Sequence, residues 1–393
     1  MDPVAAMSER MAMYSANRLK IGLFGANCSS GRAVTLVPER WSGGWDDCVR
    51  LAQMADEAGL EFLLPIGRYR GYGGDSDYQG ATLETIAWAC GLLATTKRVT
   101  VFATVHAPLF NPIVAAKQFA TADHIGHGRF GLNVVCGWKE GEFDMFSMER
   151  WAHDEGYDHA QEWLDIIKLA WSGENEIAFK GEHFDVSGVR SKPKPYGGTR
   201  PLIMNAGSSG RGRAYALRNC DAFFTGASRD SLEQTAANVK AARTEAAAGG
   251  RELDVYTVGV VTCRPTIKEA QDYHHYSVFE NADWKAVDAM MALKKISAKE
   301  LGAEAYERKR AQFANGMNGC PLIGDPDAVA SGLAELSGAG LRGIALSFVN
   351  YLDELPLFRD EVLPRLERLG VREPSIRRTH QEEDGQLRQD RQP

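Results

Sequence analysis

Residues 128–143 read GRFGLNVVCGWKEGEF, a stretch that begins as a buried strand and ends in aromatic and acidic residues. Its first half, 130–135, is an almost continuous apolar run, which is typical of a strand covered on both faces. Asn133 interrupts the run, and a buried amide without partners costs about 1–3 kcal/mol. We therefore ask what the inside of the sheet offers this side chain.

Seven further runs of strand character accompany this one, and amphipathic segments separate them. Strands are predicted over 19–25, 62–65, 99–105, 130–135, 201–204, 221–225, 255–263 and 343–348. Helices are predicted over 45–58, 83–95, 112–124, 157–171, 209–217, a long segment ending near 249, a segment from about 268, 325–336 and 352–369.

This alternation of strands and helices predicts an α/β fold with a parallel sheet. Eight strands are the number that closes into a (β/α)8 TIM barrel, here with insertions. The alternative is a doubly wound open sheet, which is disfavoured because no GxGxxG motif follows the first strand.

The remaining segments suggest a domain organisation. Residues 1–17 are predicted to be a flexible arm, 18–372 a single barrel, and 373–393 a disordered charged tail. Insertions are expected at about 172–200, as a small hairpin with a Pro-rich connection, and at about 284–320. The second insertion is polar and Lys-rich, and it is either a lid over the site, a surface elaboration or an oligomer contact.

The composition predicts a protein without nucleic-acid, metal or membrane partners. The formal net charge is -7, whereas phosphate backbones require clustered Lys and Arg. The seven cysteines form no CxxC, and no HxH follows the first strand, so we expect neither disulfides nor a metal, and a cytoplasmic location. No apolar run reaches about 18 residues, and the N-terminus lacks the apolar core of a signal peptide.

In a barrel of this kind the functional groups lie in the loops that follow the strands. The turn after the fifth strand, NAGSSGR over 205–211, combines Gly and Ser with the start of a helix. Free backbone N–H groups and the helix dipole would hold a phosphate there, with the hydroxyls of Ser208 and Ser209 as further donors. Taken alone, the turn is equally consistent with ordinary helix capping by serine.

Longer motifs across the chain, from about Lys20 to Leu369, together resemble the bacterial luciferase-like, flavin-dependent monooxygenase superfamily. Within it they look like those of dimethyl sulfone, pyrimidine and alkanesulfonate monooxygenases. The motifs are HIGHGRFGLNVVCGWKEGEF, WAHDEGYDHAQEWLDIIKLAW, FKGEHFDV, KPKP and PLIMNAGSSGRG.

The resemblance implies a (β/α)8 barrel that binds reduced FMN, supplied by a separate NAD(P)H-dependent flavin reductase. It implies transfer of one oxygen atom from O2 to a small organosulfur compound, such as a sulfone or sulfonate, or to an N-heterocycle. It also implies a homodimer or homotetramer. Two other activities stay open: an F420-dependent oxidoreductase of the same fold, and a flavin-binding protein without catalysis.

The resemblance also implies which residues form the site. Thr104 and Asn133 match inward polar residues beside the flavin and are the predicted catalytic residues. The other predicted cofactor-binding residues are Gly67, Arg68, Glu142, His153, Gly156, Tyr157, Ala206, Gly207, Ser208 and Ser209. A polar cofactor edge would then be the partner of Asn133, the alternative being hydrogen bonds to neighbouring strands.

The loop after the second strand, PIGRYRGYGG over 65–74, departs from the family pattern. Luciferase-type and alkanesulfonate enzymes place a reactive Cys or His there, and His106 follows a different strand, so we assign no general acid or base. Arg68 and Arg70 make the loop cationic, which suits an oxygen-rich substrate. One of them could instead form a structural ion pair with Glu142.

Overall fold

A computed structural model describes residues 11–136, 140–148, 153–173, 176–207 and 209–374. Its centre is a ring of eight parallel strands, each of which was predicted from the sequence. These strands are β1 (Lys20–Phe24), β2 (Phe62–Leu64), β3 (Thr100–His106), β4 (Phe130–Val135), β7 (Leu202–Asn205), β8 (Ala222–Phe224), β9 (Asp254–Cys263) and β11 (Gly343–Ser347). They pair in the order β9-β11-β1-β2-β3-β4-β7-β8, and a further pairing between β8 and β9 closes the ring. The predicted (β/α)8 barrel is confirmed.

One strand of the sheet was not predicted. β10 (Cys320–Gly324) pairs in parallel with the second half of β9, whose first half pairs with β8. β9 can serve both neighbours because it is 10 residues long. The sequence of β10, CPLIG, is short and contains Pro321, which cannot donate to a ladder, so it has the character of a loop.

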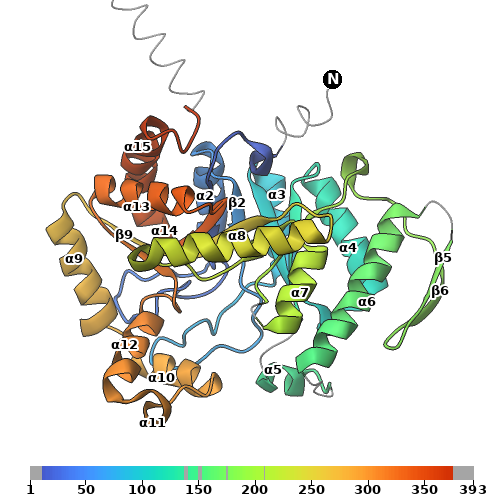
Figure 1. Ribbon diagram of the computed structural model, residues 1–393, viewed down its shortest axis with the longest axis horizontal. Helices are drawn as coiled ribbons and strands as arrows, with labels where there is room; N and C mark the ends of the chain where they lie inside the picture. Colours follow the sequence, from blue (N-terminus) through green and yellow to red (C-terminus); the bar gives the residue numbers. More distant parts are fainter. Residues whose placement is uncertain (1–10, 137–139, 149–152, 174–175, 208, 375–393) are drawn as a thin grey trace, which may run out of the picture.

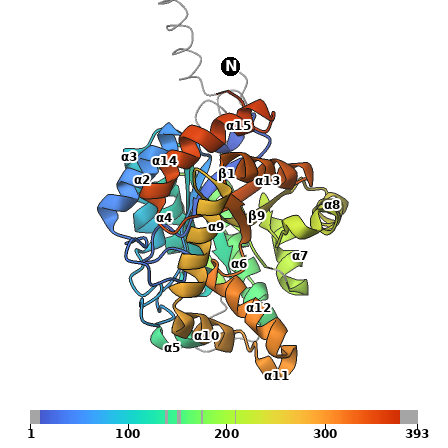
Figure 2. The same cartoon turned by 90° about the vertical axis from the view of Figure 1, so that its left-hand side faces the viewer.

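Helices surround the ring, as Figures 1 and 2 show. They are α2 (Trp45–Glu57), α3 (Thr85–Thr95), α4 (Pro112–Ile125), α6 (His153–Ser172), α7 (Gly210–Asn219), α8 (Leu232–Ala248), α9 (Ile267–His275), α13 (Pro326–Gly338), α14 (Tyr351–Leu357) and α15 (Leu363–Arg368). Several begin with local capping, as where Asn111 and Asp325 accept N–H bonds and a proline follows. Within the described residues, no helix is long and apolar enough to cross a membrane.

Aromatic side chains in contact with one another fill the inside of the barrel. The ring of Phe62 lies edge-on to those of Phe102 and Tyr256, with centroids 6.0 and 5.8 Å apart. Small residues on the neighbouring strands leave the room for these rings. A Cβ added at Gly343 would lie 2.0 Å from the Tyr256 ring, so only glycine fits there.

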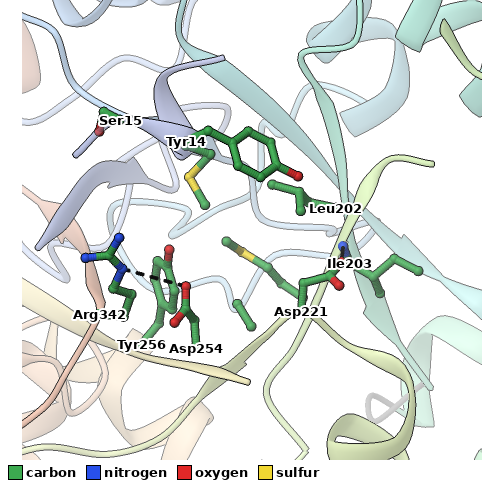
Figure 3. Close-up of a pocket in the computed structure, with 11 residues that line it drawn as sticks. Tyr14, Ser15, Leu202, Ile203, Asp221, Asp254, Tyr256 and Arg342 are labelled. Atoms are coloured by element: carbon green, nitrogen blue, oxygen red, sulfur yellow. Dashed lines mark hydrogen bonds and ion pairs between the residues drawn. The ribbon is translucent and has the colours of Figure 1, made fainter. Parts of the chain in front are cut away.

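One end of the ring, the base, is closed by the η1 turn (Ala12–Tyr14). Residues 11–17 fall within the arm predicted to be flexible, and the structure packs them against the base, where the N–H of Ala12 donates to the Arg98 carbonyl. A cavity of about 200 Å³ lies between η1 and the first residues of β7, β8 and β9, with Arg342 and Asp254 3.9 Å apart on its wall (Figure 3).

The opposite end, the rim, carries the additional helices α5 (Glu140–Met145), α10 (Trp284–Leu293), α11 (Ala298–Leu301) and α12 (Ala303–Ala314) (Figures 1 and 2). The last three lie in the predicted insertion at 284–320. Of these, α10 and α12 share a core with the loops after β1 and β2, formed by Val34, Tyr72, Tyr78, Met290, Met291 and Phe313. The hairpin of β5 (Ile177–Lys180) and β6 (Asp185–Val189) lies within the other predicted insertion.

Replacing Gly343 with Ala tests the packing inside the ring. Because the new methyl group meets the Tyr256 ring, we expect the free energy of unfolding in urea to fall by about 1–3 kcal/mol. Gly338→Ala is the matched control, since its added Cβ meets nothing within 4 Å, and its stability should change by less than about 1 kcal/mol. Equal stability of the two variants would contradict the packing described above.

Candidate active site

Thr104 and Asn133 lie side by side at the rim, because they are paired in the register of β3 and β4. The Thr104 hydroxyl donates to the Pro65 carbonyl at 2.5 Å and accepts a hydrogen bond from Asn133 Nδ2 at 3.2 Å. These two hydrogen bonds orient the Asn133 amide, whose buried Oδ1 has no hydrogen-bond partner within the described part of the molecule. The neighbouring strand therefore satisfies only half of the Asn133 amide.

The rim end of the barrel is open. Phe24, Asn133 and Val258 lie on the inner side of their strands, yet each is partly exposed, while the residues next to them in the strands are buried. Helices cover the outer side of the ring and η1 closes its base, so these three inner side chains reach solvent at the mouth. We therefore place the candidate site inside this mouth, at the carboxyl ends of the strands.

His106 extends the site from the Thr104 side. It lies two residues after Thr104 on the same face of β3, and its Nε2 lies 3.2 Å from the carbonyl oxygen of Gly67. Burial lowers the pKa of His106, so the neutral ring donates from Nε2 to this carbonyl. A Cβ added at Gly67 would lie 2.9 Å from that nitrogen, which explains the glycine. The two-residue spacing between Thr104 and His106 could have indicated from the sequence that His106 faces the site. Its contact with the loop after β2 could not have been predicted in this way.

Arg68 and Glu142 form an ion pair at the rim, with 3.8 Å between Nη1 and Oε1, and both side chains are buried. Glu142 also accepts hydrogen bonds from the backbone N–H groups of Tyr69 and Arg70, at 3.0 and 3.2 Å. Of the two interpretations of this loop, the structural ion pair with Arg68 is the one observed. Glu142 thereby fastens α5 to the loop after β2.

The turn after β7 lies next to Asn133, since Met204 pairs with Asn133 in the register of β4 and β7. Asn205 shapes the turn by donating to the Val134 carbonyl and accepting from the N–H of Gly207, both at 2.6 Å. Ser209 Oγ accepts from the N–H of Gly212 at 3.1 Å, so this serine caps α7. A Cβ at Gly207 would come within 2.8 Å of the Gly212 backbone.

α6 contributes the last part of the site. A Cβ at Gly156 would lie 3.2 Å from the Cys136 carbonyl oxygen, so this glycine lets α6 approach the end of β4. Burial raises the pKa of the next residue, Tyr157, whose hydroxyl hydrogen-bonds with Ser209. Of the other predicted residues, Ala206 is exposed in the turn, whereas Ser208 and the side chain of His153 lie outside the described residues.

The thiols and potential metal ligands at the rim offer little chemistry of their own. Cys28 follows β1, where its Sγ donates to the Gly25 carbonyl at 3.3 Å, and burial raises the pKa of this thiol to about 12. It therefore stays protonated and is a poor nucleophile at neutral pH. The parts of the chain described contain no cluster of three or more His, Cys, Asp or Glu that could hold a metal ion.

Curated proteins of known activity resemble this chain over almost its whole length. The FMNH2-dependent dimethylsulfone monooxygenase of Pseudomonas fluorescens (strain Pf0-1) is 30% identical over 374 residues, covering 92% of this chain and 98% of that protein. The pyrimidine monooxygenase RutA of Allorhizobium ampelinum is 29% identical over 369 residues, covering 91% and 98%.

Solved structures share the fold. Riboflavin lyase RcaE, determined with modified FMN and riboflavin, has a TM-score of 0.80 at 25% identity, covering 90% of this chain and 92% of that one. DmoA from Hyphomicrobium sulfonivorans has a TM-score of 0.82 at 19% identity, covering 91% and 90%. The luciferase-like monooxygenase family matches residues 20–343, which include all strands of the ring up to the start of β11. The resemblance seen in the motifs is thus confirmed, and the chain belongs to the luciferase-like monooxygenase family.

Proposed function

We propose that this enzyme is a two-component monooxygenase that uses FMNH2 to insert one oxygen atom of O2 into a small organosulfur or N-heterocyclic substrate. The supporting observation is the mouth itself, where a glycine- and serine-containing turn lies beside a buried acceptor, Asn133 Oδ1, that has no partner in the described structure. The relatives named for dimethylsulfone and pyrimidine oxidation support these two substrate classes. A separate NAD(P)H-dependent flavin reductase would supply FMNH2.

The phosphate of FMN would be held at the start of α7. This helix has 10 residues, and its first turn presents backbone N–H groups and the positive end of its dipole. Ser209 and Tyr157 add hydroxyl groups at the same point. Capping by Ser209 does not compete with this role, because it engages the N–H of Gly212 and leaves the earlier N–H groups for a ligand.

The isoalloxazine ring would lie between this turn and the loop after β2. Asn133 Oδ1 would accept from an N–H of the ring, and the missing side chain of Gly67 leaves space beside Thr104. Bound reduced FMN supplies the two electrons that activate O2. Tyr69 and Phe146, edge-on with centroids 4.9 Å apart, stand at the rim and would help to exclude water.

The oligomeric state and the cellular location of the protein stay predictions. They are a homodimer or homotetramer and a cytoplasmic location. The catalytic role of Thr104 and Asn133 likewise stays a prediction. So do the cofactor-binding roles of all twelve residues named for them, which are Gly67, Arg68, Thr104, Asn133, Glu142, His153, Gly156, Tyr157, Ala206, Gly207, Ser208 and Ser209.

The first test is a coupled assay with FMN, NADH, a generic flavin reductase and candidate substrates such as dimethyl sulfone and uracil. We expect O2 consumption and conversion of a substrate only when the reductase is present. The protein without flavin should bind FMNH2 with a dissociation constant in the micromolar range. Preference for F420 over FMN in a binding titration would instead favour the deazaflavin-dependent oxidoreductase. Tight binding of oxidised FMN with no turnover would favour a flavin-binding protein.

The second test separates phosphate binding from helix capping at Ser209. Aspartate caps helices as well as serine does, but its charge repels phosphate. We therefore expect Ser209→Asp to unfold at the wild-type urea concentration while FMN affinity falls at least about tenfold, and Ser209→Ala to lose part of both. Wild-type FMN affinity in Ser209→Asp would place the phosphate elsewhere.

The third test concerns Asn133. Asn133→Ala removes the hydrogen-bond acceptor proposed for the isoalloxazine ring but leaves the turn after β7 intact. The amount of product formed per O2 consumed should fall about tenfold or more, because the ring loses the acceptor that orients it for oxygen transfer. The affinity for FMN should change much less than in Ser209→Asp. If the variant forms as much product per O2 consumed as the wild type, Asn133 has no role in the proposed oxygen transfer.

A further inference from the structure

Four arginines in the described structure are almost entirely buried, and two of them are paired with a carboxylate. The exposed fractions are 7% for Arg32, 8% for Arg68, 3% for Arg129 and 7% for Arg372. Arg68 pairs with Glu142, and Arg372 pairs with Glu61 at 2.9 Å. Burying a cation is costly unless a counter-charge or a full set of hydrogen bonds compensates. The other two arginines therefore need an explanation.

Arg129 shows how a buried guanidinium is satisfied without a carboxylate. Its Nη1 donates to Thr96 Oγ1 and the Val99 carbonyl, at 3.0 and 3.1 Å. Its Nη2 donates to the carbonyls of Leu93 and Thr96, at 2.8 and 3.0 Å. These four hydrogen bonds tie the residue before β4 to the connection between α3 and β3, which gives Arg129 a structural role.

Arg32 lacks both forms of compensation. Its Nη2 donates to the Gly316 carbonyl at 2.5 Å, and its buried Nε has no hydrogen-bond partner in the described part of the chain. Burial lowers the pKa of this guanidinium, and the groups that oppose the shift most are tyrosines and Cys28 rather than carboxylates. The hydroxyl of Ser30, two residues earlier, is also buried with no partner among the described residues.

Arg32 lies in the mouth of the barrel. Its Cζ stands 4.6 Å from the centroid of Phe24, the partly exposed inner residue at the end of β1. The loop that accepts its hydrogen bond packs on β9, because a Cβ at Gly316 would lie 2.6 Å from Val260. The guanidinium is therefore positioned between β1 and β9, on the inner side of the ring.

A second arginine strengthens the positive potential there. Burial raises the pKa values of Tyr72 and Tyr78, and the charges of Arg32 and Arg68 oppose this shift at both phenols. Gln79 bridges the two loops, since its Nε2 donates to the Gly31 carbonyl and its Oε1 accepts from Arg68 Nε. Arg68 is paired with Glu142, whereas among the described residues the groups that most oppose the lowered pKa of Arg32 include no carboxylate.

We propose that Arg32 forms an oxyanion subsite in the mouth, which binds the sulfonate or carboxylate head group of the substrate. This inference rests on the proposed monooxygenase function and narrows its substrates to compounds with a negatively charged, oxygen-bearing head. A guanidinium offers several N–H donors in a planar fork that matches such a group, and the hydroxyl of Ser30 supplies another donor from the same loop.

The binding test uses methanesulfonate and acetate as anionic probes and dimethyl sulfone as the neutral one, titrated calorimetrically into the full-length protein with and without FMN. At least one anion should bind more tightly than dimethyl sulfone. Arg32→Met should weaken its binding about 10- to 100-fold, as expected for a lost charge-assisted hydrogen bond, and Arg32→Lys should restore part of it. Equal anion binding by wild type and Arg32→Met would overturn the inference.

Stability distinguishes a ligand-binding residue from a structural one. Arg32→Met removes a charge without a counter-charge, so its urea midpoint should equal or exceed that of the wild type. Arg129→Met is the matched control, and its midpoint should fall because four hydrogen-bond acceptors lose their donor. A loss of stability in Arg32→Met as large as in Arg129→Met would assign Arg32 to the framework and contradict the proposal.

Anaerobic titration with reduced FMN separates this inference from the function on which it rests. Arg32→Met should keep the wild-type affinity for FMNH2, unlike Ser209→Asp. A loss in Arg32→Met as large as in Ser209→Asp would show that Arg32 serves the cofactor, which overturns the subsite and leaves the monooxygenase intact. Failure of the wild type itself to bind FMNH2 would refute the proposed function, and the anion titration without FMN is judged independently.

Discussion

Every feature of the site depends on the pairing of β8 with β9, in which Ala222, Phe223 and Phe224 match Asp254, Val255 and Tyr256. Without this pairing the strands would form an open sheet with exposed edges. With it, parallel strands place all their carboxyl ends around one mouth, so residues as far apart in the chain as Phe24, Asn133 and Val258 face one another. The length of β9 allows it to close the ring and still carry β10.

Much of this architecture was predictable because strong local signals agreed with the final structure. Each strand of the ring is a short apolar run bounded by turn residues, and the placement of Thr104 beside Asn133 follows once β3 and β4 are neighbours. β10 was missed because Pro321 makes a five-residue segment resemble a loop. The contact between His106 and Gly67 and the isolation of Arg32 were not predictable, since both depend on the placement of side chains from distant segments.

The mouth combines rigid supports with polar atoms that the fold leaves without partners. Glu142 fastens the loop after β2, Asn205 shapes the turn after β7, and Thr104 holds the amide of Asn133 in one orientation. Against these supports, Asn133 Oδ1 and Arg32 Nε are buried without partners in the described residues. Such atoms lower the stability of the protein by itself, and for these two we propose that a bound ligand satisfies them.

The segments at the base have a practical consequence. The N–H of Arg18 donates to the Val371 carbonyl at 3.0 Å, and the N–H of Glu373 donates to Asn17 Oδ1 at 2.8 Å, so residues 17–18 and 371–373 are joined beneath the barrel. A tether attached near either segment would emerge on the side away from the mouth. The protein could therefore be immobilised, or fused to an electron-supplying partner, without obstructing the diffusion of small molecules into the ring.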